Sequence, residues 1–165
     1  MALFNSVTAR TAGFNVSDIG MLSGSATAVV IFLMFIGGSP GGFAGGIKTT
    51  TFALSMLNLK RILQARKDVE LFGRRMDKTL CNRAFAVLLL SGIWIFSATT
   101  LILFLQPEFL LIDVLFETVS AFSTVGLSRG ITGELSEASK LVITLTMFVG
   151  RIGVMNFFFS FLVVN

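Results

Sequence analysis

The stretch that decides the fold is Phe116-Glu-Thr-Val-Ser-Ala-Phe-Ser-Thr-Val-Gly-Leu-Ser128. It belongs to a semi-apolar segment that starts at Asp113, and a helix over residues 113–123 would cover only about 16 Å, half of a membrane. Asp113 suits the start of that helix, because the helix dipole favours a negative charge there. Gly126 follows in a non-helical stretch, and such backbone is tolerated at membrane depth only against protein or a water-filled cavity. The stretch therefore predicts a re-entrant half-helix and a pore-lining turn.

The composition of the whole chain is that of an integral membrane protein. Of 165 residues, 54% are hydrophobic and 13% are charged, against about 25% charged in a typical soluble domain. The mean hydropathy is +0.87. These values exclude a disordered chain, a basic nucleic-acid-binding domain and an ordinary soluble enzyme. The chain has no His and a single Cys, Cys81, which excludes a His-based triad, a His metal site and a disulfide framework.

Three apolar segments are long enough to cross a bilayer, which takes about 20 helical residues. The segments 19–47 and 84–107 carry no charge, and the segment 141–165 carries a single charge, Arg151. We therefore expect an all-α polytopic membrane protein.

The positive charge is concentrated between the first two apolar segments. Residues 60–83 hold eight basic and three acidic side chains. A basic segment beside membrane spans determines topology, so we place residues 60–83 in the cytoplasm and do not expect nucleic-acid binding. The first and third spans then run inward and the second runs outward.

The chain contains an internal repeat, which appears when the sequence is shifted along itself. In one register Thr11-Ala-Gly13 aligns with Thr124-Val-Gly126, and Met34-Phe-Ile-Gly37 aligns with Met147-Phe-Val-Gly150. A register shared by separate matches is better evidence than any single match. The repeat is parallel, which argues against a secondary carrier with inverted repeats. The first copy is incomplete, so we expect the chain to be the end of a longer protein.

Both Thr-x-Gly stretches are candidates for an ion filter. Potassium filters replace the hydration shell of the ion with backbone carbonyls, and Gly permits the left-handed backbone that turns carbonyls inward. A single Thr-x-Gly is usually an ordinary turn, but two copies, each before an apolar span, favour the filter. Glu117 lies within the half-helix, where we expect it to brace the filter by hydrogen bonds and not to contact an ion.

These motifs together resemble the Trk/Ktr/HKT potassium transporter superfamily, and most closely the membrane subunits of Ktr systems. The resemblance rests on residues 6–15, 116–128 and 147–153 and on Met34-Phe-Ile-Gly-Gly-Ser-Pro-Gly-Gly-Phe-Ala-Gly-Gly-Ile-Lys-Thr-Thr-Thr51. Members of that superfamily carry four membrane-helix/pore-helix/membrane-helix repeats of the potassium-channel type in one chain, and the resemblance implies this fold here. The resemblance implies an incomplete third repeat over residues 1–59, the basic cytoplasmic loop over 60–83 and a complete fourth repeat over 84–165. It also implies that one Gly per repeat lines the filter, here Gly13 and Gly126.

The predicted site has two parts, a potassium filter and a gate. The filter residues are Thr11, Ala12, Gly13, Phe14, Thr124, Val125, Gly126 and Leu127. The gate residues are Gly37, Gly38, Ser39, Pro40, Gly41, Gly42, Gly45, Gly46, Lys48 and Arg151.

The gate follows from the glycine run and from one charge within a span. Six glycines and Pro40 within residues 37–46 cannot sustain a regular helix, so the segment must be irregular and line a cavity. Close helix packing is the weaker alternative. Arg151 lies within the third span, and we expect it to project beneath the filter and to hold the glycine run through backbone carbonyls. Lys48 either joins the gate or marks the inner interface.

The predicted function is potassium uptake across the cytoplasmic membrane, without enzymatic chemistry or a covalent cofactor. Sodium remains open as a coupling ion. The resemblance implies, besides the bilayer, three partners: the missing N-terminal repeats, a second copy in a homodimer, and a cytosolic nucleotide-binding regulatory subunit. The alternative is a non-conducting membrane scaffold or partner subunit that keeps the fold.

Overall fold

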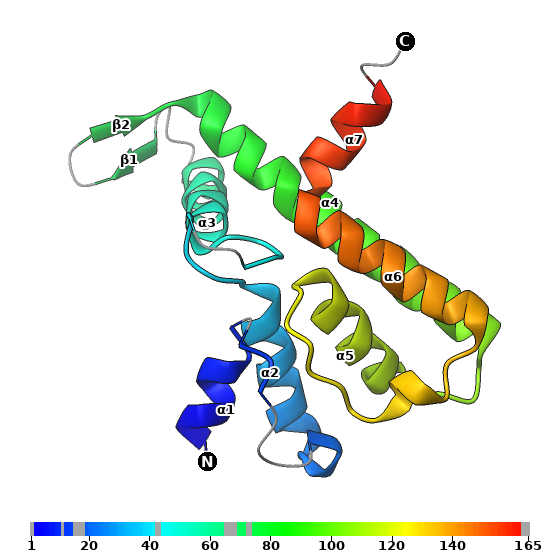
Figure 1. The fold of residues 1–165 in the computed structure, drawn as a ribbon. Coiled ribbons are helices and arrows are strands. Elements are labelled where there is room, and N and C mark those ends of the chain that lie inside the picture. The colour runs from blue at the N-terminus through cyan, green and yellow to red at the C-terminus, as the bar shows by residue number, and fades with distance from the viewer. Residues whose placement is uncertain are drawn as a thin grey trace.

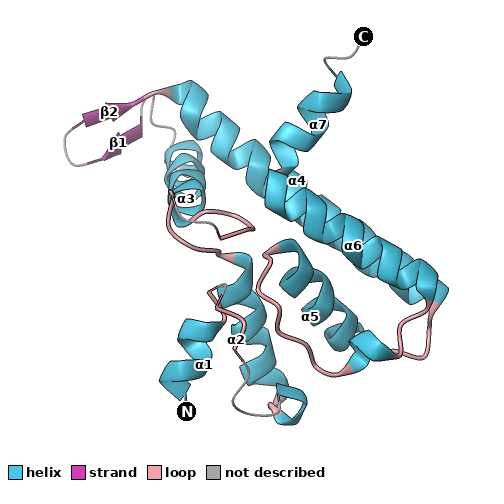
Figure 2. Cartoon of the chain, viewed as in Figure 1, coloured by secondary structure: helices cyan, strands magenta, loops and turns pink. Residues whose placement is uncertain are grey.

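A computed structural model of the chain describes residues 2–10, 12–14, 19–41, 44–64, 69–71 and 74–162. The architecture is helical, as expected, with one short antiparallel strand pair (Figures 1 and 2). The elements are α1 (Ala2–Thr8), the 3-10 turn η1 (Ile19–Met21), α2 (Gly24–Phe35), α3 (Thr49–Leu63), β1 (Val69–Leu71), β2 (Arg74–Met76), α4 (Lys78–Leu105), α5 (Leu111–Phe122), η2 (Ile131–Gly133), α6 (Glu137–Ile152) and α7 (Val154–Leu162).

Helix α5 is the predicted half-helix and lies at the centre of the fold. It has 12 residues, so it is about 18 Å long and reaches across half of a bilayer core. It packs against α2, α4 and α6, and all of residues 116–122 are buried. Figure 1 shows α5 between α2 on one side and the α4–α6 pair on the other. Burial of its last seven residues explains how so short a helix is held without a side-chain cap.

Helix α4 corresponds to the second predicted span, with an earlier start. It has 28 residues and begins at Lys78, before the predicted boundary at Ala84, because Asp77 caps it by accepting the Thr79 N–H at 3.0 Å. Of the helices in the described part of the chain, α4 alone is long and apolar enough to cross a bilayer, and α6 with α7 make a second if the bent pair is one span.

The first predicted span is not one helix. Helix α2 ends at Phe35 and α3 begins at Thr49, and the described residues between them, 36–41 and 44–48, are not helical. The glycine run is the reason, as the sequence predicts. The ends of this segment are tied together, because Ile36 and Ile47 form a parallel bridge and Gly37 N–H donates to the Ile47 carbonyl at 2.8 Å. We call residues 36–48 the glycine loop.

The third predicted span is also broken. Helix α6 starts at Glu137 and stops at Ile152, and α7 continues at an angle of 98° to it. Gly153 forms the break with a φ of 92°, a left-handed conformation that favours glycine. The segment 141–165 is therefore not one straight helix, and α7 projects away from α6 in Figure 1.

Residues 60–83 contain more regular structure than the sequence indicates. Residues 60–63 finish α3, residues 78–83 begin α4, and β1 pairs with β2 between them. The two helices pack against each other, and the buried Asn58 amide of α3 donates to the Cys81 carbonyl of α4 at 3.4 Å. The basic segment is thus a hairpin between two packed helix ends, and its cytoplasmic location stays a prediction.

The internal repeat reappears in the bounds of the helices. Helix α2 starts at Gly24 and α6 at Glu137, and these positions correspond in the register found in the sequence. Ser23 and Ser136 are the two N-caps, and the hydroxyl of each accepts a backbone N–H from the first turn. The correspondence in structure supports the repeat found in the sequence.

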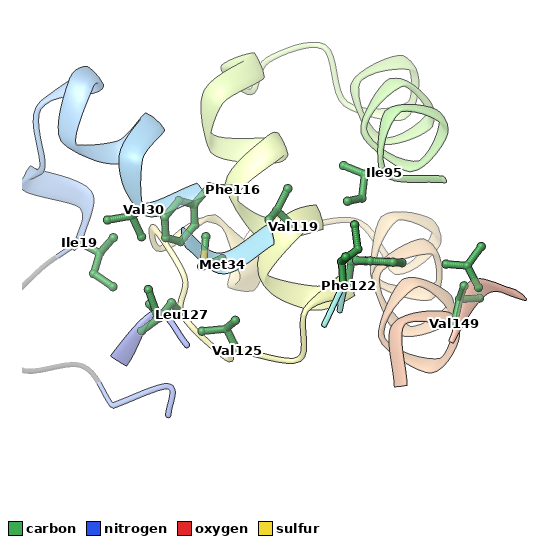
Figure 3. Close-up of a cluster of buried hydrophobic side chains, with 13 residues drawn as sticks. Ile19, Val30, Met34, Ile95, Phe116, Val119, Phe122, Val125, Leu127 and Val149 are labelled. Atoms are coloured by element: carbon green, nitrogen blue, oxygen red, sulfur yellow. The ribbon is translucent and has the colours of Figure 1, made fainter. Parts of the chain in front are cut away.

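The main hydrophobic core joins the two copies around α5. Phe116, Val119 and Phe122 of α5 pack with Met34 and Val30 of α2. Figure 3 shows these side chains together with Ile19, Ile95, Val125, Leu127 and Val149. The core therefore brings both copies of the repeat against the same central helix.

Candidate ion filter and gate

The two predicted filter turns lie against each other. Gly13 and Gly126 both have a left-handed backbone, with φ of 69° and 88°. A side-chain carbon at Gly13 would collide with the Val125 carbonyl oxygen, so the two turns touch although they belong to different copies of the repeat. Thr11 lies outside the described residues. The geometry brings the two turns, one from each copy, into direct contact.

Each turn is tied to the half-helix that precedes it. The Thr8 hydroxyl donates to the Phe14 carbonyl at 2.7 Å, and the Ser120 hydroxyl donates to the Leu127 carbonyl at 2.6 Å. Phe14 and Leu127 are equivalent under the repeat, so the two copies use the same device. These two carbonyls are engaged by the scaffold.

Thr124 has an unusual backbone and links the second turn to the glycine loop. Its φ is 52°, a conformation that a β-branched residue rarely adopts. Its hydroxyl accepts the Gly45 N–H at 3.0 Å. A side-chain carbon at Gly45 would collide with that hydroxyl, so glycine is required for the close approach. The predicted gate therefore contacts a predicted filter residue.

The glycine loop is also held by α6. Gly46 N–H donates to the Gly150 carbonyl at 3.4 Å. A side-chain carbon at Gly46 would lie 2.8 Å from the Ser123 hydroxyl, which is buried without a hydrogen-bond partner in the described part of the chain. Figure 1 shows the loop reaching from the α2–α3 connection toward the end of α5. The loop therefore lies directly beside the end of the half-helix.

The predicted gate residues are spread over the whole loop. Gly37 and Gly45 are buried at the contacts just described, whereas Ser39, Pro40 and Gly41 are exposed. Gly38, Gly46 and Lys48 are half-buried. Gly42 lies outside the described residues.

Lys48 and Arg151 meet at one cavity of about 440 Å³ beside the loop. Its walls come from the loop, α3, α4, α6 and α7, and include Ala44, Gly46, Lys48, Val87, Arg151 and Asn156. The Lys48 ammonium donates to the Ala44 carbonyl, so this cation holds its own loop. Arg151 is exposed at the end of α6 and lines the same space. The structure thus brings together the two cations that the sequence considered for the gate.

Glu117 braces the segment after the second turn, as expected. Its carboxylate is 6% exposed and accepts three hydrogen bonds, from the Ser128 hydroxyl, from Arg129 N–H at 3.1 Å and from the Thr132 hydroxyl at 3.0 Å. These contacts are internal to the protein, so the described structure shows Glu117 as a support.

Several residues of the site are not found by reading the sequence. They are Thr8 and Ser120 behind the turns, Ser123 beside the loop, and Thr27 and Arg129 between the copies. The hydroxyls in the last turn of each half-helix are a signal that could have been used. Arg129 has no such signal, because two of its partners lie 110 and 102 residues away in the chain.

The chemistry available at the two turns is that of neutral oxygen ligands. No group of three or more His, Cys, Asp or Glu side chains converges among the residues that the structure describes. The described groups at the turns are backbone carbonyls and hydroxyls, the kind of neutral oxygen that replaces the hydration shell of potassium in ion filters. A half-helix, a glycine turn and an interrupted helix, present in two copies, define a pore-loop membrane protein of cation-transport type.

The particular family follows from comparison with known proteins. The family model TrkH, described as a cation transport protein, matches residues 1–164, and the chain belongs to this family. The family consists of transporters and not of enzymes.

Relatives of the chain are named potassium uptake proteins. The chain is 41% identical over 159 residues to the Ktr system potassium uptake protein D of Bacillus subtilis, covering 96% of this chain and 35% of that protein. It is 38% identical over 152 residues to the Ktr system potassium uptake protein B of Vibrio alginolyticus, covering 92% and 33%. The chain thus spans about a third of the length of these curated relatives.

A solved structure shares the fold. The crystal structure of the potassium transporter TrkH from Vibrio parahaemolyticus matches with a TM-score of 0.75 at 20% sequence identity, over 92% of this chain and 34% of that one. At this identity the match concerns the fold alone.

Proposed function

We propose that the chain forms part of a potassium uptake pathway across the cytoplasmic membrane. The observation that carries the proposal is the contact between the two glycine turns, with the glycine loop bonded to one of them. The family and the names of the relatives support the ion and the direction of transport. Sodium stays a candidate coupling ion.

In this proposal the filter is lined by backbone carbonyls of both turns. The ligands are the carbonyls of residues 11–13 and 124–126. Phe14 and Leu127 contribute differently, because hydroxyls from the half-helices already hold their carbonyls and fix the turns. The negative C-terminal end of α5 adds attraction for a cation beside the turns. The remaining ligands would come from the two repeats that lie outside this sequence.

The glycine loop is the proposed gate. Its closed position is held by the hydrogen bonds from Gly45 to Thr124 and from Gly46 to Gly150. Opening requires both bonds to break, and small residues allow the backbone to move past the end of α5. Arg151 and Lys48 at the adjoining cavity repel a cation that leaves the filter. This repulsion raises the barrier to cation passage in the closed state.

The proposed assembly follows the resemblance. Residues 1–59 and 84–165 act as the third and fourth repeats of a four-repeat pore. Two copies of the whole protein form a homodimer in the bilayer. The basic segment, with its β1–β2 hairpin, is the proposed contact for a cytosolic nucleotide-binding regulatory subunit.

Rescue of potassium uptake in cells without their own uptake systems tests the proposal. The chain is expressed alone and together with a matching two-repeat N-terminal half. Rescue by the pair only would show two halves of one transporter, and rescue by the chain alone would show that two copies close a pore. If neither rescues while both reach the membrane, the chain is a non-conducting scaffold and the proposal fails.

A further inference from the structure

Arg129 joins the two copies of the repeat near the start of α5, at the end of that helix opposite the glycine loop. Its side chain is 14% exposed, and its Nε donates to the Asp113 carboxylate in the first turn of α5 at 2.6 Å. Its Nη1 donates to the Thr27 hydroxyl of α2 at 2.8 Å and to the Ile19 carbonyl of η1 at 3.3 Å. One guanidinium thus connects the half-helix of one copy to the other copy.

Arg129 connects the two segments that follow the filter turns. The Arg129 N–H donates to Glu117, so the chain after Gly126 is fixed to α5. Ile19 and Gly20, whose carbonyls accept from the same guanidinium at 3.3 and 3.5 Å, belong to the segment after Gly13. Leu127 of the second turn and Ile19 belong to one buried cluster, and Figure 3 shows both.

The partners of the guanidinium are built for this contact. Thr27 is fully buried, and its hydroxyl also donates to the Ser23 carbonyl at 3.0 Å, which leaves its oxygen facing Arg129. Asp113 supplies the opposite charge in a half-buried setting, with its side chain 17% exposed. Charge-assisted hydrogen bonds from a planar fork are directional, so they fix an orientation as well as a distance.

We propose that Arg129 is a positioning residue that sets the spacing of the two filter turns and thereby the preference of the pore for potassium over sodium. This inference rests on the proposed function. A carbonyl filter distinguishes the two ions through the placement and number of its oxygens, so a change in the spacing of the turns alters selectivity more than it alters total transport. Arg129 itself touches no ion in this account.

The test measures the ratio of potassium uptake to sodium uptake for each variant. The variants are made in the form of the transporter that rescues uptake, either the chain alone or the pair of halves. The amount of each variant in the membrane is quantified. Thr27→Val removes a partner of the guanidinium and keeps size, shape and charge. Arg129→Lys keeps the charge and loses the fork. We expect each to lower the ratio by a factor of about ten, the size expected for loss of a buried charge-assisted hydrogen bond.

Lys140→Gln is the matched control. Lys140 pairs with Glu137 on the exposed start of α6, with side chains 43% and 91% exposed, and this ion pair includes none of the groups around Arg129. The substitution removes one positive charge without touching the link between the copies. Its ratio is expected to equal that of the unaltered protein.

The outcomes separate the inference from the function. An unchanged ratio in Thr27→Val at normal membrane level overturns the inference, even if Arg129→Lys does not reach the membrane. A wild-type ratio in Arg129→Lys shows that charge alone matters and also overturns it. Absence of any cation uptake by the unaltered protein overturns the proposed function together with the inference.

Discussion

At the scale of single residues, the site depends on a few hydroxyls that meet backbone groups from distant parts of the chain. Thr124 shows this most clearly. Its left-handed φ of 52° costs free energy, about 1–3 kcal/mol for such a conformation. The surrounding contacts, including the hydrogen bond from Gly45, hold it there. The position of the glycine loop therefore depends on this side chain.

Thr124→Val is expected to weaken closure of the gate. The valine keeps the β-branched shape but leaves the buried Gly45 N–H without its acceptor, which costs about 1–3 kcal/mol. We expect potassium flux in the resting state to rise several-fold, measured as uptake in cells without the regulatory subunit. Thr124→Ser keeps the hydroxyl and is the control, so equal fluxes in the two variants would contradict the prediction.

Glu117→Gln is expected to destabilise the fold around α5. The carboxylate accepts from three donors, and the substitution removes its negative charge, so these hydrogen bonds lose their charge-assisted strength. We expect the midpoint of thermal unfolding in detergent to fall, with a loss of about 2 kcal/mol in the free energy of unfolding. Glu137→Gln, at a side chain that is 91% exposed, is the control and should leave the midpoint unchanged.

At the scale of secondary-structure elements, close approach of α5 and α6 decides where the filter and gate meet. Gly150 lies in α6 where a side-chain carbon would collide with the Phe122 carbonyl oxygen at the end of α5. The carbonyl of the same Gly150 accepts from the glycine loop. One helix position therefore brings the half-helix, the gate and α6 together.

Gly150→Ala is expected to force α6 away from α5 and to reduce potassium uptake strongly. The collision is with backbone, which cannot move aside as a side chain can, and overpacking of this kind costs about 1–3 kcal/mol. Thermal unfolding in detergent and uptake in cells measure the two effects. Gly92→Ala in α4 is the control, because nothing lies within 4 Å of the added carbon. Equal behaviour of the two variants would contradict the expected role of the contact.

At the scale of the whole molecule, the cavity beside the loop is made by parts of the chain that are far apart in sequence. The glycine loop, α4, α6 and α7 all contribute walls, and the 98° bend at Gly153 places α7 beside them. Lys48 and Arg151 lie in those walls, so the electrostatics of the proposed gate is a property of the assembled fold.

Arg151→Gln is expected to raise resting potassium flux. Removing one positive charge lowers the repulsion of a cation at the cavity and so weakens the barrier of the closed state. Potassium uptake is measured with and without the regulatory subunit. The ratio of the first rate to the second should be smaller than in the unaltered protein. Lys140→Gln, at a cation whose side chain is 43% exposed and does not line the cavity, is the control. Unchanged flux and unchanged gating in Arg151→Gln would remove this residue from the gate.

The sequence by itself determined the local features of the protein. The half-helix, the glycine turns, the break in the first apolar segment and the internal repeat are all encoded within short stretches, because apolar length and glycine content act over a few residues. The register of the repeat even relates the starts of α2 and α6.

Only the tertiary structure decided how these features meet. No short pattern in the sequence relates the positions that meet in the fold. Examples are the bend at Gly153, the close approach of Gly150 and Phe122, the hydrogen bond between Gly45 and Thr124, and the link made by Arg129. The physical reason is that a hydrogen bond or close contact between distant segments depends on how whole helices pack. A side chain such as Arg129 has the same appearance in the sequence whether it faces solvent or binds two repeats together.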